Sequence, residues 1–462
     1  MINVATSLNN YMRNTEDRRI LANQIPDVAF YRMFAKNFNN NEFVGNNVEI
    51  LLKTKRSMRG KAHGENLDLP SPGAVEYQKM LWPLAELITT AGVTKQAIDR
   101  ATGGQASWGN IVEDALDDLD LDFEYLKCIS AYGTGKGILG IVGDGSTGDP
   151  AVESGGIVTV KVDSTYTDTG VENVAHMREG MLVEVYSADG NTKRTANGGV
   201  EVLSVTFGNR KNGVPTYGTF TFAAANDCSI ADGDIVYIHG AKSEALTRPL
   251  PTGLMYWLQD GTHFNAAIRE SQHYGLNRAS YGALRARIYQ AQDFGLASET
   301  PADGTPTFWG ASVISDAIMD VKRGSGRGKV DSLMMCSDMG MCLSRINRTD
   351  SNIQVVVNTT KAQDQAVVPV QLPSTFIAPD GTAIPIEYDE MLPNNCIVGI
   401  TTKDGQMHQK GSFDFLREYG EVWEPSRGDR KTNYEAPYGG YLQFTTDRCD
   451  NHFMIQDLRS DL

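Results

Sequence analysis

The hydrophobic pattern begins with a polar arm. Residues 1–41 are rich in asparagine and carry one weak helical stripe of apolar residues. The stripe consists of Val28, Phe30, Tyr31, Phe34 and Phe38. A segment with so few apolar residues cannot bury its aromatic rings alone, so we expect an arm that becomes ordered when it docks on a neighbouring molecule.

Two extended runs follow the arm, at residues 48–55 and at about 67–77, and the polar segment 56–66 separates them. The pattern predicts a hairpin with few core residues, which should project from the body. A short run with a buried character comes next, at residues 82–93.

A long amphipathic helix is predicted over residues 107–131, with Ser107 as its N-cap. Its polar face is strongly acidic, with seven acids within residues 113–124. They are Glu113, Asp114, Asp117, Asp118, Asp120, Asp122 and Glu124. Like charges at i,i+4 repel one another, so this face needs either solvent or an opposite charge beside it. It is therefore either a solvated surface or a docking surface for a basic partner.

Residues 155–245 change to short alternating runs with turn residues between them, which predicts a small all-β barrel or sandwich. The candidate strands are 157–162, 181–187, 200–207, 218–224 and 234–240. The pattern is mixed again from residue 246. There we expect helices at 280–294 and 308–323, a buried strand at 330–337, a strand pair at 384–400 and a β-rich stretch at 412–462.

Composition limits the classes of function. The 462 residues suffice for roughly three domains, and 41% hydrophobic with 21% charged residues is typical of a globular protein. The 42 basic and 57 acidic residues give a net charge of −15, which argues against a general nucleic-acid coat. The six cysteines form no C-x-x-C pair and indicate buried core residues in a reducing compartment. We expect neither a signal peptide nor a membrane span.

Motifs for chemistry are weak. The loop 133–140 matches G-x-G-x-x-G through Gly135, Gly137 and Gly140, but it follows a helix rather than a strand, so we favour a helix end and turn over a nucleotide site. The seven histidines show no i,i+3 or i,i+4 pairing, and no nucleophile elbow is present. We therefore predict no enzyme activity, no cofactor and no metal site.

Five basic residues and no acids lie within residues 53–61 of the expected hairpin: Lys53, Lys55, Arg56, Arg59 and Lys61. Three interpretations are open. The basic run contacts nucleic acid, or it is a solvated tip that resists aggregation, or it pairs with the acidic helix of a neighbouring copy. The third interpretation explains both unusual charge runs. The acidic partners of the basic run would be Asp117, Asp118, Asp120, Asp122 and Glu124. Contacts of this heterologous kind close rings or extend lattices.

This order of segments resembles the major capsid proteins of tailed bacteriophages with the HK97-type fold, an α+β fold. The glycine-rich run AYGTGKGILGIVG at 131–143 and PIEYDEMLPNNCIVGI at 385–400 are similar to segments of that family. The β-region resembles the extra barrel of P22-like coat proteins, especially in REGMLVEVYSADG at 178–190.

The resemblance implies a domain order. It comprises an N-terminal arm at 1–41, an E-loop hairpin at 42–79, a P-domain with its spine helix at 80–143 and 412–462, an A-domain at 144–154 and 246–411, and an inserted β-domain at 155–245.

The implied function is a coat protein that self-assembles into hexamers and pentamers of an icosahedral phage head around double-stranded DNA. The implied partners are other copies, a separate scaffolding protein, a portal, a decoration protein and weakly held DNA, with no membrane. The implied location is the virion, after assembly in the host cytoplasm. A cross-link like that of the type member would need Lys53, Lys55 or Lys61 and Asn451, but we do not expect it, because the sequence shows no buried acid that would catalyse it.

Two alternatives come from other classes. An encapsulin-like compartment shell would share the fold and package a cargo enzyme. An enzyme with an appended β-domain is the third possibility, and the absence of a catalytic motif argues against it.

Overall fold

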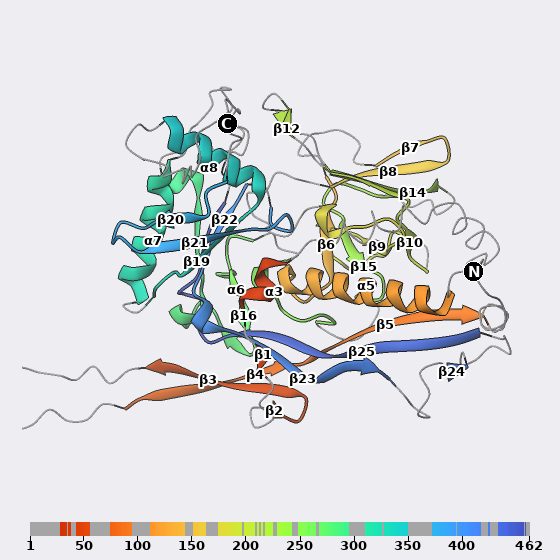
Figure 1. Ribbon diagram of the computed structural model, residues 1–462, viewed down its shortest axis with the longest axis horizontal. Coiled ribbons are helices and arrows are strands. Elements are labelled where there is room, and N and C mark those ends of the chain that lie inside the picture. The colour runs from red at the N-terminus through yellow and green to blue at the C-terminus, as the bar shows by residue number, and fades with distance from the viewer. Residues whose placement is uncertain are drawn as a thin grey trace, which may run out of the picture.

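The protein is described from a computed structural model (Figure 1). The structure describes residues 28–34, 36–37, 43–55, 74–94, 111–143, 151–162, 174–195, 198–207, 210–211, 214–215, 218–224, 229–242, 248–264, 268–294, 310–325, 328–349, 372–393, 395–416, 424–425, 433–456 and 458. Within these ranges no helix is long and apolar enough to cross a membrane.

A long helix lies on an extended sheet, as Figure 1 shows. The helix is α5 (Ile111–Tyr132), which agrees with the predicted helix at 107–131. The sheet contains β5 (Ala85–Thr94), β25 (Asn433–Thr446) and β23 (Gly405–Phe415), with the short strands β1 (Lys36–Asn37) and β24 (Glu424–Pro425) at its margins. Leu119 and Phe123 of α5 are buried against this sheet, and the Phe123 ring lies 4.8 Å from Phe413 and 5.0 Å from Tyr438. Apolar burial therefore fixes which face of the helix is inside.

The predicted hairpin is present, but its second strand differs in position. Strand β3 (Asn47–Lys55) pairs with β4 (Glu76–Pro83) and, at its start, with β2 (Phe43–Val44). Strand β4 runs to Pro83, where the sequence predicted an end near Tyr77. The buried side chains of Met80 and Trp82 explain the extension, because they face the core at the hairpin's base. The predicted tip at 56–66 lies outside the described residues.

The β-rich middle of the chain forms two four-stranded sheets around one core. One sheet has the order β10 (Val200–Glu201), β9 (Leu182–Tyr186), β15 (Ile235–Ile238) and β6 (Ile138–Ile141). The other has the order β11 (Ser204–Thr206), β14 (Gly218–Ala223), β8 (Ile157–Val162) and β7 (Ala151–Ser154). All five predicted strands are confirmed, although the run at 200–207 divides between the two sheets. Alternate residues such as Val160, Val185 and Phe220 fill the shared core.

A mixed six-stranded sheet forms the other side of the molecule (Figure 1). Its order is β18 (Arg287–Gln290), β26 (Phe453–Gln456), β22 (Ile397–Ile400), β19 (Ser332–Met335), β21 (Ala383–Tyr388) and β20 (Thr375–Ile377). Helices α7 (Ala311–Ser325) and α8 (Ser337–Thr349) pack on it. The strands expected at 330–337 and 384–400 and the helix expected at 308–323 are confirmed.

The helix expected at 280–294 is wrong. This stretch forms a 3-10 turn (Gly282–Leu284), then β18, then a second 3-10 turn (Ala291–Phe294). Residues 287–290 instead pair in parallel with β26, and Arg287 and Tyr289 both donate to Asp320 of α7. Tertiary pairing of a β-branched and aromatic stretch overrides the local helical pattern here.

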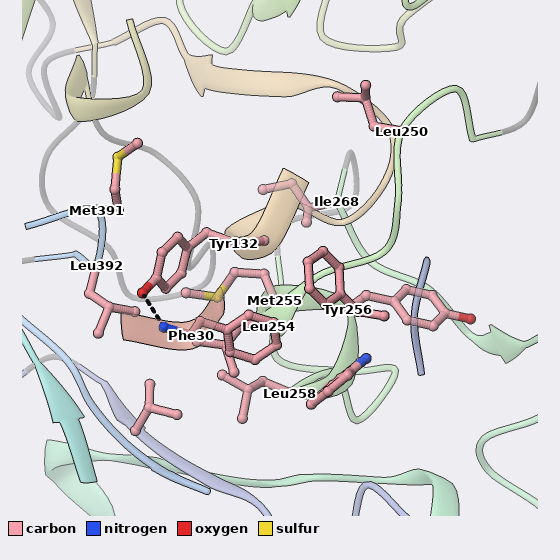
Figure 2. Packing of buried hydrophobic residues seen from close by; sticks show 14 of the residues in the cluster. Phe30, Tyr132, Leu250, Leu254, Met255, Tyr256, Leu258, Ile268, Met391 and Leu392 are labelled. Atoms are coloured by element: carbon pink, nitrogen blue, oxygen red, sulfur yellow. Dashed lines mark hydrogen bonds between the residues drawn. The ribbon is translucent and has the colours of Figure 1, made fainter. Parts of the chain in front are cut away.

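The arm was expected to order only on a neighbour, and the structure corrects this for its last part. Helix α3 (Ala29–Met33) is embedded in its own chain. Phe30 is fully buried, and its ring lies 4.8 Å from Phe34, 5.1 Å from Trp257 and 5.5 Å from Phe444 (Figure 2 shows its surroundings). Residues 1–27 lie outside the described residues.

The glycine-rich loop is a helix end and turn, as favoured above. Gly135 and Gly137 have φ of +85° and +75°, and a Cβ at either would meet neighbouring atoms within 3.0 Å. The loop leads from α5 into β6, so no helix begins where a dinucleotide site would need one. Five cysteines are free and buried, which agrees with their expected role as core residues.

Replacing Phe30 with Ala should destabilise the folded chain by about 3–5 kcal/mol, because it removes a fully buried aromatic ring and leaves a cavity. Urea unfolding followed by tryptophan fluorescence measures this. Tyr77→Ala is the matched control, since that ring is 57% exposed and should cost about 0.5 kcal/mol or less. Equal unfolding midpoints for the two variants would show that the arm helix is not part of the core.

Candidate assembly surfaces

The β3–β4 hairpin has two faces of different character. Residues that pair across the two strands share a face, so Val48 with Trp82 and Ile50 with Met80 form the inner face. Beyond Asn47 with Pro83 at the base, the outer face carries three cross-strand pairs: Glu49 with Leu81, Leu51 with Lys79, and Lys53 with Tyr77. Apolar and charged residues alternate on this outer face.

The apolar residues of the outer face are exposed. Leu51 is 64%, Tyr77 57% and Leu81 42% exposed. Figure 1 shows the hairpin extending from the body, and the side chains on its outer face stay exposed, while Leu52 on its inner face is 5% exposed. Clustered apolar exposure on a projecting element marks a surface that a partner covers.

The structure places the predicted basic residues only in part. Lys53 is exposed on the outer face of β3. Lys55 is placed by its backbone, opposite Glu76 at the end of the hairpin ladder. Arg56, Arg59 and Lys61 lie outside the described residues, in the chain segment that connects β3 with β4. Lys79 is a further basic residue that the sequence analysis did not select, and it pairs with Glu49 at 2.6 Å.

The predicted acidic residues lie in two rows on the exposed part of α5, Asp118 with Asp122 and Asp120 with Glu124. Asp118, Asp120, Asp122 and Glu124 are exposed, and Asp117 is placed on the helix by its backbone. Partial burial, together with the nearby Asp118 carboxylate, raises the pKa of Asp122. Glu124 pairs with Lys127, one turn further along. Mutual repulsion among these carboxylates costs the subunit free energy.

The structure does not bring the basic and acidic stretches together within one chain. In Figure 1 the hairpin extends to the left, away from the N-terminal half of α5. None of the ion pairs among the described residues joins Lys53 to an acid of this helix. Pairing between the two stretches therefore requires a second copy.

A buried carboxylate joins several parts of the chain, and the sequence analysis missed it. Asp389 Oδ2 accepts from the Ala29 amide at 2.7 Å and from the Tyr132 hydroxyl at 2.5 Å, and Oδ1 accepts from the Met391 amide at 3.0 Å. Burial raises the pKa of Asp389, although these hydrogen bonds act in the opposite direction. The only sequence signal was its place in the run IEYDEMLP.

The same turn also holds the β-rich part of the chain. His176 Nε2–H donates to the Met391 carbonyl at 3.0 Å, and the Asp389 amide donates to the Met335 carbonyl of β19 at 3.1 Å. Figure 2 shows Tyr132, Met391 and Leu392 close to Phe30. Arg178 adds a second link, because its guanidinium lies 5.1 Å from the centre of the Tyr125 ring on α5.

A metal ion and a reactive thiol each require particular surroundings. No group of three or more histidine, cysteine or acidic side chains is arranged among the described residues to hold a metal ion. Burial raises the pKa of Cys128 and of Cys336 to about 12, so these thiols are poor nucleophiles.

The cross-link considered in the sequence analysis would need an accessible Asn451. Asn451 donates to Asp404 and is 4% exposed, which keeps its side chain from a lysine of another chain.

No family model matches the chain, and no curated protein matches it. Solved structures do. The capsid asymmetric unit of cyanophage A-1(L) has a TM-score of 0.44 at 10% identity, with coverage of 95% of this chain and 92% of that chain. The capsid of the native GTA particle has a TM-score of 0.43 at 10% identity, with coverage of 93% and 90%. The holo-SrpI encapsulin complex from Synechococcus elongatus has a TM-score of 0.39 at 7% identity, with coverage of 95% and 90%.

The chain resembles phage capsid proteins. Two of these structures are capsids, and the third is an encapsulin complex.

Buried histidines should make the subunit sensitive to acid. Burial lowers the pKa of His176, His408 and His452 to about 4, from an ordinary 6.5. His452 Nδ1 also accepts from the Thr401 amide at 3.2 Å, which protonation there would prevent. The unfolded chain thus binds more protons between pH 6.5 and 4, and stability falls as the pH falls through this window. Each of these histidines should lower the free energy of unfolding by about 2 kcal/mol at pH 5 relative to neutral pH.

Urea midpoints measured at pH 7, 6 and 5 test this expectation. The variant His176→Gln keeps a donor for the Met391 carbonyl and removes one titrating group, so it should lose less stability than the parent on acidification. A parent midpoint that stays constant from pH 7 to pH 5 would contradict the assignment of neutral, buried histidines.

Proposed function

We propose that the chain is a major capsid protein that self-assembles into hexamers and pentamers of an icosahedral phage head around double-stranded DNA. The observation that carries this proposal is the β3–β4 hairpin, which extends from the body and leaves Leu51, Tyr77 and Leu81 exposed on its outer face. An isolated two-stranded hairpin is marginal in water, so such an element is expected to pack on another molecule. The chemistry is association rather than turnover.

The partner surface is the acidic side of α5 in the next copy. The hairpin would bring Lys53, Lys55, Arg56, Arg59 and Lys61 close to Asp117, Asp118, Asp120, Asp122 and Glu124. Exposed ion pairs contribute about 0–1 kcal/mol each. Leu51 and Tyr77 on the same face would add apolar burial, and a closed shell repeats the contact in every copy.

The segments then take the roles of the HK97-type fold. Residues 1–41 are the N-terminal arm, 42–79 the E-loop, 80–143 with 412–462 the P-domain, and 144–154 with 246–411 the A-domain around which capsomers form. Residues 155–245 form the inserted β-domain, held on the body through His176 and Arg178.

Further partners follow from the same proposal. They are a separate scaffolding protein, a portal, a decoration protein and packaged DNA. The net charge of −15 suits DNA that is held weakly and released later. An encapsulin-like shell would differ in its contents, since its particles would carry a protein cargo instead of DNA.

Charge reversal tests the contact between copies. The double variant Arg56→Glu with Arg59→Glu should leave the subunit folded and reduce closed particles at least roughly tenfold, because it places acids against an acidic helix. Adding Asp118→Lys and Asp120→Lys in the same chain should restore part of the yield. Sucrose-gradient sedimentation measures the particle fraction, and circular dichroism verifies the fold.

Lys242→Glu with Lys403→Glu is the matched control, because it makes the same charge change at two exposed sites away from the hairpin. This control should assemble like the parent. Unchanged particle yield in the Arg56/Arg59 variant, or equal loss in the control, would refute the proposed pairing.

A further inference from the structure

The base of the hairpin meets a strained residue. Tyr274 has φ of +45° and is the one non-glycine residue in the described part of the chain with positive φ. It lies with Gly275, at φ +88°, in the two-residue turn between β16 (Gln272–His273) and β17 (Leu276–Asn277). Positive φ at both positions marks a type I′ turn, for which Asn-Gly is the preferred sequence. Tyrosine is therefore a costly residue for the local backbone, and strain of this kind points to a role outside the turn.

The Tyr274 ring fills the space between the hairpin and the core. Its centroid lies 4.1 Å from that of Trp82 in β4, at an interplanar angle of 36°. The Arg248 guanidinium lies 4.9 Å from the ring centroid. Trp82 is fully buried, and its indole N–H has no hydrogen-bond acceptor among the described residues, so packing alone positions that ring.

The Tyr274 hydroxyl joins a hydrogen-bond network that ends on the same strand. It lies 3.0 Å from Thr252 Oγ1 and accepts from Gln443 Nε2 at 3.4 Å. Gln443 Nε2 also donates to the Pro83 carbonyl at 2.6 Å, at the end of β4. Both the ring and the hydroxyl of Tyr274 thus contact groups that hold residues 82–83.

We propose that Tyr274 is a positioning residue for shell assembly, which holds the base of the β3–β4 hairpin through Trp82 and so sets the direction in which the hairpin leaves the body. The backbone strain of the turn is kept because an aromatic ring at this position contacts the hairpin. This proposal rests on the proposed function only where assembly is concerned, and the contact itself can be tested on the isolated subunit.

Two substitutions separate the contact of Tyr274 with Trp82 from the conformation of the β16–β17 turn. Tyr274→Asn gives the turn its preferred Asn-Gly sequence and removes the ring. Tyr274→Phe keeps the ring and the strain and removes the hydroxyl. If Tyr274 matters only for its own turn, the Asn variant should be at least as well ordered as the parent in both the β16–β17 and the β3–β4 hairpins. If the Tyr274 ring holds β4, only the β3–β4 hairpin of the Asn variant should loosen.

Hydrogen–deuterium exchange of the full chain measures this. In Tyr274→Asn the amides of β4 near Trp82 should exchange roughly tenfold faster, as expected when one aromatic contact is lost. Those of β16 and β17 should exchange no faster than in the parent, and Tyr274→Phe, which keeps the ring contact with Trp82, should loosen β4 much less than Tyr274→Asn does. In an assembly assay Tyr274→Asn should yield open or irregular particles, while Tyr274→Phe closes normally.

Unchanged exchange of β4 in Tyr274→Asn would overturn the proposal, and so would global unfolding of that variant or equal loosening of both hairpins. If the parent forms no particles under any condition, the proposed function fails, while the exchange experiment still decides whether Tyr274 holds the hairpin.

Discussion

A buried carboxylate at the end of β21 determines how the parts of this molecule meet. Asp389 is 3% exposed and receives hydrogen bonds from the arm helix, from the last turn of α5 and from its own turn. Burying a carboxyl group is unfavourable unless its oxygens are satisfied, so these donors are held in place together. The next residues of the turn carry the contact to His176, which adds the β-rich sheets to the same junction. Four segments far apart in sequence therefore have one common fixed point.

The junction explains why a rigid body can carry a long, exposed hairpin. Phe30 packs with Trp257, Phe444 and, at the end of the long helix, Tyr132, and strand β5 under that helix is joined to β4 of the hairpin by Leu84 alone. This core does not cover the outer face of the hairpin, where Leu51 and Tyr77 remain exposed. The subunit thus leaves apolar area uncovered that association with another copy can bury.

Periodicity in the sequence predicted the elements whose burial is regular. The long helix was visible because Leu119, Phe123 and their neighbours repeat at helical spacing over several turns. The strands of the β-rich region were visible because valine and phenylalanine alternate with polar residues. The helix expected at 280–294 failed because Ile288 and Tyr289 are buried by pairing with β26, which lies more than 160 residues away in sequence. Local pattern carries no signal for such long-range partners.

The candidate surfaces were predictable to different degrees. Runs of like charge showed the basic hairpin and the acidic helix directly, since charge is read from composition. Asp389 and Tyr274 gave no comparable signal, because their roles depend on groups that only the fold brings close, such as Ala29 and Trp82. The arm was expected to need a neighbour, yet its residues Phe30 and Phe34 are buried in their own chain. Hydrophobic pattern shows that an aromatic stripe must be covered, but not by which molecule.

Electron microscopy of the purified full-length protein, with and without a candidate scaffolding protein, tests the central claim most directly. A coat protein should form closed shells, capsomer rings or tubes built from one repeating contact. A monodisperse monomer or dimer under both conditions would contradict the account, because the exposed hairpin would then have no second copy to cover it.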